Sequence, residues 1–119
     1  VQKRGLAPYS RYLVGAAVRG RSGAIYTGCN VENAAYPQGW CAEASAIAAM
    51  VSAVERRITA VLTLSSGPIM GTCCGGCRQK IREFAEVTVP IHSCGPEGLR
   101  RSFTLEELLP FSFGPENLP

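Results

Sequence analysis

One segment restricts the possible folds more than any other: residues 41–55 are rich in strong helix formers and contain neither Gly nor Pro. Apolar side chains occur almost all the way round the helix that this segment predicts. Such a helix is largely buried by the rest of the chain. The sequence therefore predicts a layered fold in which this helix packs against other elements.

The remaining elements are short apolar or β-branched runs separated by Gly- and Pro-rich turns, which predict strands. Glycines at both ends of residues 20–23 predict a hairpin turn, and the capping-box spacing of Thr104 and Glu107 predicts the start of a short last helix. The order β-β-α-β-α-β-β-α predicts a single domain over residues 1–119, with a mixed sheet and helices on both faces. The strands are expected at residues 13–19, 25–31, 59–64, 87–93 and 99–103, and the second helix at residues 77–85.

The charged residues exclude several functional classes. All nine acidic residues are Glu, and His92 is the only histidine. The chain therefore has no Ser-His-Asp triad, no HExxH zinc-protease helix and no aspartate for holding magnesium. A net charge of +3 is too small for the dense basic surface of a nucleic-acid-binding protein. No apolar run approaches the roughly 20 residues of a membrane span.

The six cysteines favour a metal site over a disulfide framework. Six of 119 residues is a share below the roughly 8–10% of a disulfide scaffold. Three of the six crowd into the segment Cys73-Cys74-Gly-Gly-Cys77. This usage is typical of a reduced, cytoplasmic protein with thiolate ligands.

Two segments that begin predicted helices carry the chemistry: one contains Cys41 and Glu43, the other Cys74 and Cys77. A helix N-terminus lowers the pKa of a cysteine and favours the thiolate that binds metal. Three thiolates would hold Zn²⁺ and leave its fourth position to water, which is typical of a catalytic site. Glu43 lies within the same turn as one ligand and can move a proton from that water to a substrate. This chemistry suits hydrolytic deamination.

The sequence resembles the small, homotetrameric, zinc-dependent cytidine deaminases. Five segments in the family's order carry the resemblance: residues 7–16, 27–36, 41–43, 74–79 and 107–115. The resemblance implies an α/β fold, a three-layer α-β-α sandwich with a mixed five-stranded sheet. It also implies hydrolysis of cytidine and 2′-deoxycytidine to the uracil nucleosides, with release of ammonia, in pyrimidine salvage. Most of the family's first helix is expected to lie outside residues 1–119.

The resemblance assigns the central residues one by one. Cys41, Cys74 and Cys77 match the ligands of one Zn²⁺ per subunit, and Glu43 matches the proton shuttle. Arg78, beside these ligands, is expected to offset their negative charge together with the two helix N-termini.

Substrate-binding positions also follow from the resemblance. Asn30 and Glu32 match the pair that binds the sugar 3′-hydroxyl, Ala42 together with the shuttle carboxylate matches the positions that read the base edge, and Tyr12 matches an aromatic that lines the nucleoside pocket. Phe113 matches an aromatic that stacks on the base from a neighbouring subunit. The implied assembly is a homotetramer whose active sites are completed between subunits.

Two departures from the family pattern stand out. Cys73 occupies a position that is usually Pro, so it competes with Cys74 for the role of second ligand, although the Cys-x-x-Cys spacing favours Cys74. Ala44 occupies a position that is often Arg, which leaves the negative site with less compensation.

Alternative functions remain open at this point. Taken alone, Cys74 and Cys77 also fit a structural zinc knuckle or a redox pair. Rival functions are a deaminase of another aminopyrimidine compound such as blasticidin S, and a non-catalytic zinc-binding module. The Asn30 and Glu32 pair favours a nucleoside substrate, and Glu43 favours catalysis.

Overall fold

A single mixed sheet organises the chain, which the computed structural model describes from Val1 to Pro119. The strand order is β2-β1-β3-β4-β5, and only the β3–β4 pair is parallel. The predicted mixed sheet of five strands is therefore confirmed. The strands are β1 (Val14–Gly20), β2 (Ile25–Cys29), β3 (Ile58–Ser65), β4 (Pro90–Gly95) and β5 (Gly98–Thr104).

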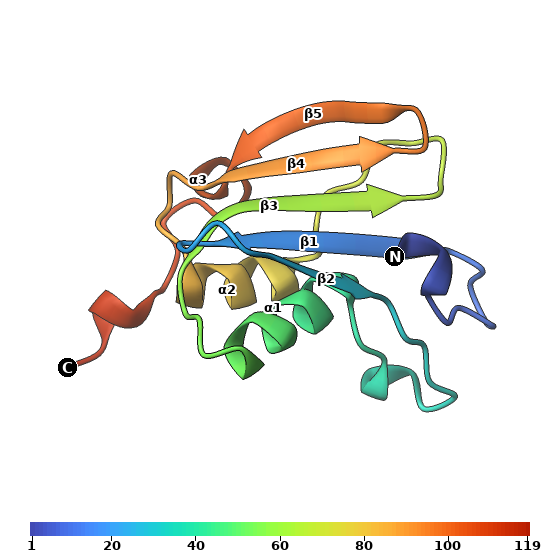
Figure 1. Cartoon of the computed structure of the whole chain (residues 1–119), viewed down its shortest axis with the longest axis horizontal. Helices are drawn as coiled ribbons and strands as arrows, with labels where there is room; N and C mark the ends of the chain where they lie inside the picture. The colour runs from blue at the N-terminus through green and yellow to red at the C-terminus, as the bar shows by residue number, and fades with distance from the viewer.

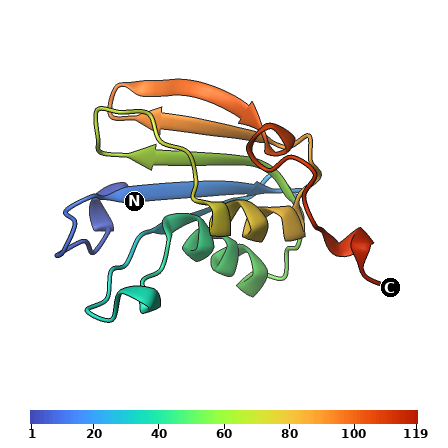
Figure 2. The same cartoon turned by 180° about the vertical axis from the view of Figure 1, so that it is seen from behind.

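The two longer helices, α1 (Ala42–Ser52) and α2 (Gly75–Phe84), cover the same face of the sheet (Figures 1 and 2). The short α3 (Leu105–Leu108) follows β5 and contacts α2. On the opposite face Leu62 is 39% exposed and no helix packs there, so the predicted helices on both faces of the sheet are not seen within residues 1–119. Three-residue 3-10 helices complete the chain: η1 (Gln2–Arg4), η2 (Tyr36–Gln38) and η3 (Pro115–Asn117). None of the helices is both long enough and apolar enough to span a membrane.

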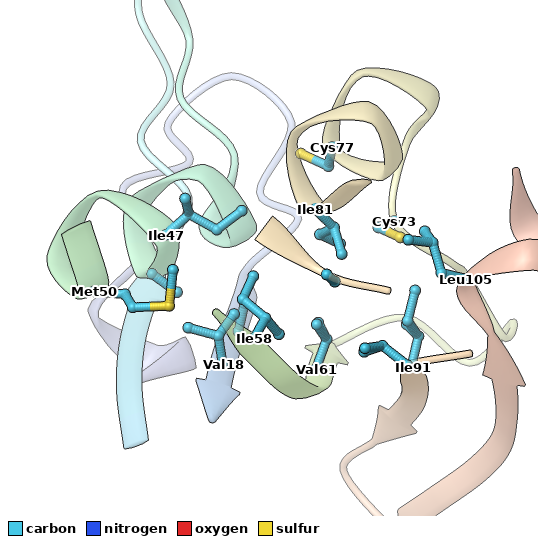
Figure 3. Close-up of a cluster of buried hydrophobic side chains, with 14 of the residues drawn as sticks. Val18, Ile47, Met50, Ile58, Val61, Cys73, Cys77, Ile81, Ile91 and Leu105 are labelled. Atoms are coloured by element: carbon cyan, nitrogen blue, oxygen red, sulfur yellow. The ribbon is translucent and has the colours of Figure 1, made fainter. Parts of the chain in front are cut away.

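The core lies between the sheet and the helices α1 and α2 (Figure 3). Val18, Val61 and Ile91 form one row across three strands, because Val18 pairs with Val61 and Val61 with Ile91. Met50 of α1 and Ile81 of α2 pack into the same cluster, and all five side chains are at most 1% exposed. Burying side chains of this size stabilises the fold by about 1.5–3 kcal/mol each. The core therefore holds α1 and α2 against the sheet.

The first turn of α1 lies directly against β2 at Gly28. A Cβ on Gly28 would lie 2.5 Å from the Ala42 carbonyl oxygen and 2.5 Å from the Ala46 nitrogen, so only glycine fits. The Ser45 hydroxyl donates a hydrogen bond to the Cys29 carbonyl oxygen across the same contact, at 3.1 Å. This close approach sets the position of the segment that begins α1.

The helices begin and end a few residues from the predicted boundaries. The helix predicted over residues 41–55 ends at Ser52, because Val54 adopts a left-handed φ of 62° that an α-helix does not accommodate. The second helix begins at Gly75, two residues before its predicted start, with Cys74 as its N-cap. The predicted capping box that starts α3 is confirmed.

Two strands are shorter than predicted. The second strand ends at Cys29, because the backbone of Val31 pairs with Trp40 instead of with β1. The fourth strand begins at Pro90 rather than three residues earlier, because a turn precedes it. The Val31–Trp40 pairing places the residue before Cys41 beside the end of β2.

Candidate active site

Three free thiols from two helix starts converge at one end of the helical layer. Cys41 is the N-cap of α1, Cys74 is the N-cap of α2, and Cys77 lies in the first turn of α2. Their sulfur atoms all lie within 4.8 Å of one another, and those of Cys41 and Cys74 are 4.0 Å apart. Neither N-cap side chain bonds to the backbone of its helix.

The donor set of this cluster fits a zinc ion. Three thiols at helix N-termini are soft ligands that lose their protons easily beside a cation, and a set of three leaves one tetrahedral position open. Cys77 is fully buried, whereas Cys41 and Cys74 are exposed to the adjoining cavity. The three thiols could therefore hold one metal ion, and the open position of that ion would face the cavity.

The three thiols differ in acidity. Burial raises the pKa of the Cys41 thiol, and burial followed by the Glu43 charge raises the pKa of the Cys77 thiol. Burial acts in the same direction on Cys74, but the nearby Cys77 backbone N–H and the thiols of Cys77 and Cys41 outweigh it, so the pKa of Cys74 is lowered. Cys74 is thus the thiol of the cluster that loses its proton first.

Cys73 lies in the hydrophobic core rather than in the thiol cluster. It is 3% exposed and belongs to the buried cluster that includes Ile81 and Leu105 (Figure 3). Burial and, next, the Glu43 charge raise the pKa of Cys73 to about 11, so its thiol stays protonated at neutral pH. The geometry therefore groups Cys74, not Cys73, with the other two thiols.

Glu43 is a buried carboxyl group beside the thiols. It is the second residue of α1, is 5% exposed and lines the same cavity as Cys41 and Cys74. Burial raises the pKa of Glu43, while its own backbone N–H and the charge of Lys80 act to lower it. A carboxyl group in this environment changes its protonation state more readily near neutral pH than an exposed one does.

A cavity of about 330 Å³ opens in front of the thiols and Glu43. It brings together most of the residues that the sequence singled out, and Cys77 lies behind its wall. The lining residues that were predicted are Tyr12, Asn30, Glu32, Cys41, Ala42, Glu43 and Cys74.

Several lining residues were not predicted. Trp40 was missed although it immediately precedes Cys41. Thr63 and Ser65 place hydroxyl groups on the inward face of β3, and their alternation in an otherwise apolar strand was a usable signal. Gly71 and Thr72 line the cavity from the loop before α2, where no periodicity points to a role.

Asn30 and Glu32 hold the chain segment that borders the cavity. The Asn30 amide accepts a bond from the Val14 backbone N–H at 3.0 Å and donates one to the Tyr12 carbonyl at 2.8 Å. The Glu32 carboxylate accepts bonds from the backbone N–H groups of Tyr9 and Ser10 and from the Ser10 hydroxyl. The bonds from Ser10 lower the pKa of Glu32, so this carboxylate is ionised at neutral pH.

Arg78 contacts backbone and hydroxyl oxygens rather than thiols. Its guanidinium donates to the Cys73 carbonyl at 2.8 Å, to the Leu108 carbonyl at 2.6 Å and to the Thr72 hydroxyl at 2.5 Å. These bonds tie the loop before α2 to α3. None of these three bonds goes to a thiol of the cluster, and the offsetting of the thiolate charge by Arg78 stays a prediction.

Phe113 lies outside the cavity of its own chain. Its side chain is 57% exposed, and its carbonyl accepts a hydrogen bond from the Gln79 amide at 2.9 Å. The nearby Phe111 is fully exposed. The C-terminal segment thus presents two aromatic rings to the surroundings of the chain.

The fold and the thiol cluster together define the class of α/β proteins with a cysteine-held zinc site. A family model, the cytidine and deoxycytidylate deaminase zinc-binding region, matches residues 1–93. The chain belongs to the cytidine and deoxycytidylate deaminase family. This membership confirms the resemblance seen in the sequence.

Individual relatives agree with this assignment. The cytidine deaminase of Sporosarcina psychrophila is 38% identical over 119 residues, which cover 98% of this chain and 86% of that protein. That of Mycobacterium tuberculosis (strain H37Rv) is 38% identical over 113 residues, 94% of this chain and 80% of that protein. The crystal structure of the Burkholderia pseudomallei cytidine deaminase matches with a TM-score of 0.88 and 32% identity, over 94% of this chain and 90% of that chain. The predicted family fold is confirmed by this match.

Proposed function

We propose that the protein hydrolyses cytidine and 2′-deoxycytidine to uridine and 2′-deoxyuridine, with release of ammonia, in pyrimidine salvage. The observation that carries the proposal is Glu43: a buried carboxyl group two residues after Cys41, facing the same cavity as the thiols. A structural zinc site has no use for such a carboxyl group. In the reaction, water adds to C4 of the pyrimidine ring, the bond between C4 and the amino nitrogen breaks, and ammonia leaves.

Cys41, Cys74 and Cys77 would hold the zinc ion in this proposal. When bound there, Zn²⁺ lowers the pKa of water towards about 7 and so supplies a nucleophile at neutral pH. The helix N-termini that carry the thiols contribute partial positive charge to the same place.

Glu43 moves the protons in the proposed reaction. Its carboxylate takes a proton from the attacking water and returns it to the substrate, ending on the departing nitrogen. Burial raises the pKa of Glu43, which makes its carboxylate a stronger base for the proton of the water than an exposed carboxylate.

The nucleoside is oriented by the cavity rim. Asn30 and Glu32 are placed to take the sugar 3′-hydroxyl, and the hydrogen bonds that both make to the segment 9–14 keep them fixed before substrate arrives. Tyr12 and Ala42 both line the cavity, where Tyr12 would flank the base and Ala42 would meet the base edge. These contacts select a small nucleoside rather than a polynucleotide.

Assembly into a homotetramer completes the proposed site. Phe113 does not reach the cavity of its own chain, and its exposed ring is available to stack on a base held by a neighbouring subunit. The outer face of α1 exposes Ala48 and Ala49, which allow close approach of a second helix. The six free cysteines suit the reducing cytoplasm, which is the proposed compartment.

The absorbance change that accompanies conversion of cytidine to uridine tests the proposal. The parent protein should deaminate cytidine and lose this activity after chelation, and added zinc should restore it. Turnover of another aminopyrimidine compound such as blasticidin S, with cytidine untouched, would replace the proposed substrate. Stoichiometric zinc with no turnover of either compound would instead make the protein a non-catalytic zinc-binding module.

A further inference from the structure

The zinc site proposed above concentrates negative charge. Three thiolates with one Zn²⁺ carry a net charge of −1, and the Glu43 carboxylate lies beside them. On α1, the residue that follows Glu43 is Ala44, which brings no charge. A cation near the thiols would therefore offset part of this negative charge.

Arg78 is the first candidate for this cation, but its hydrogen-bond donors are engaged elsewhere. They bond to the Cys73 and Leu108 carbonyls and to the Thr72 hydroxyl. A guanidinium oriented by these three acceptors fixes the loop, and none of these bonds goes to a thiol of the metal cluster. The next cation along α2 is Lys80.

The Lys80 side chain runs back towards the start of α2. Lys80 lies three residues after Cys77 and four after Gly76, on the same side of the helix. Its Nζ atom lies 3.8 Å from the place that a Cβ on Gly76 would occupy. Gly76 lies between Cys74 and Cys77, so the ammonium group sits over the turn that supplies two of the three thiols.

Lys80 also faces α1 across a shallow groove. Ala44, Trp40 and Lys80 line this groove together, so the lysine lies opposite the uncharged residue that follows Glu43. Lys80 forms none of the ion pairs of the chain.

We propose that Lys80 is a positioning residue of the metal site, whose positive charge offsets that of the thiolates and the carboxylate and so tightens zinc binding. The inference rests on the proposed function only for the identity of the metal. Lys80 on α2 would thus supply the positive charge that Ala44 on α1 does not bring to the site.

Zinc affinity, measured by competition with a chromophoric chelator, tests this role without any assay of activity. Lys80→Met keeps most of the side-chain length and removes the charge. It should raise the zinc dissociation constant about 3- to 10-fold at low ionic strength. This effect is at or below the roughly 10–100-fold loss that is typical when a group bonded directly to a metal ligand is removed. Lys80→Glu should raise the dissociation constant further. Lys80→Arg should keep the zinc dissociation constant of the parent. In about 1 M salt, screening should shrink the differences in zinc affinity between the variants and the parent.

Lys3→Met is the matched control, because Lys3 is the only other lysine and its replacement makes the same change in net charge. Two outcomes would overturn the proposal. One is a loss of zinc affinity in Lys3→Met equal to that in Lys80→Met, and the other is a zinc affinity within about twofold of the parent for both Lys80→Met and Lys80→Glu. Circular dichroism should show unchanged folding, because Lys80 is exposed. If the parent protein binds zinc but leaves cytidine intact, the proposed reaction is wrong. The zinc affinities of the Lys80 variants would still decide the role of Lys80.

Discussion

The sulfur atoms of Cys41 and Cys74 lie 4.0 Å apart although each residue caps a different helix. Cys73, adjacent to Cys74 in the chain, instead has its side chain in the core. Cys73 is thus buried and Cys74 exposed although both line the same cavity, and the difference can be measured.

Replacing these two cysteines should separate metal binding from packing. Cys74→Ala should abolish stoichiometric zinc binding, because it removes one of three ligands. Cys73→Ala should keep one zinc per chain and lower the free energy of unfolding by about 0.5–1.5 kcal/mol, the scale for removing one buried heavy atom. Metal analysis and denaturant unfolding of both variants provide the check; zinc lost from Cys73→Ala and kept in Cys74→Ala would reverse the ligand assignment.

Glu43→Gln should nearly abolish turnover while zinc remains bound. The amide keeps the shape of the side chain but cannot carry protons, and general acid–base catalysis is worth about 10²- to 10⁴-fold for one transfer. Steady-state kinetics and metal analysis of the same preparation are needed. Activity within a few-fold of the parent would remove Glu43 from the proton transfers.

The sugar should be recognised through its 3′-hydroxyl. A 3′-deoxy analogue would leave polar groups of Asn30 and Glu32 without a partner, at a cost of about 1–3 kcal/mol. Cytidine and 2′-deoxycytidine should both react well, and 3′-deoxycytidine should show a kcat/KM lower by about one to two orders of magnitude. Equal kcat/KM values for the three compounds would show that these residues act only on the segment 9–14.

Phe113→Ala should weaken substrate binding more than it slows chemistry. Stacking on a base is worth about 1–3 kcal/mol, so KM should rise with little change in kcat. Phe111→Ala serves as the control, because it removes another exposed ring from the same segment. Light scattering on the parent should show a tetramer, and a fully active monomer at micromolar concentration would refute the contribution of Phe113 in trans.

Glu55 should stabilise the fold only above mildly acidic pH. Hydrogen bonds from the Ser22 backbone and the Tyr26 hydroxyl lower the pKa of Glu55 from its ordinary value of 4.5. A carboxyl group with a lower pKa in the folded state stabilises that state above its unfolded pKa, and the effect disappears as the pH falls through the folded value. Glu55→Gln should therefore lower the melting temperature at pH 7, with the difference from the parent shrinking at pH 3; an equal difference at both pH values would contradict this linkage.

Residue spacing and the family resemblance together predicted Cys41, Cys74 and Cys77 as the zinc ligands and Glu43 as their neighbour, and the structure brings the three thiols together. Cys41, Glu43, Cys74 and Cys77 follow a local pattern in which helix geometry alone brings two members of each segment together. The mixed sheet followed for a similar reason, since alternation and turn residues act over a few positions.

Features set by tertiary contacts could not be predicted in this way. Arg78 reaches the Leu108 carbonyl only because α3 packs beside α2. The end of β2 depends on the pairing of Val31 with Trp40, which competes with continuation of the strand. The groove that Lys80 shares with Ala44 similarly requires the relative position of α1 and α2, which no local pattern gives.

Because Cys41 and Cys74 form no side-chain caps, local unfolding of the first turns of α1 and α2 depends on what binds the two thiols. Ser, Thr, Asp or Asn at an N-cap would hold the first N–H groups of each helix locally, whereas these two thiols are free for a shared ligand. A metal ion bound to both would link the fraying of the two helix starts, since metal binding and local folding are coupled. Two segments 33 residues apart in the chain would then exchange their amide hydrogens as one cooperative unit.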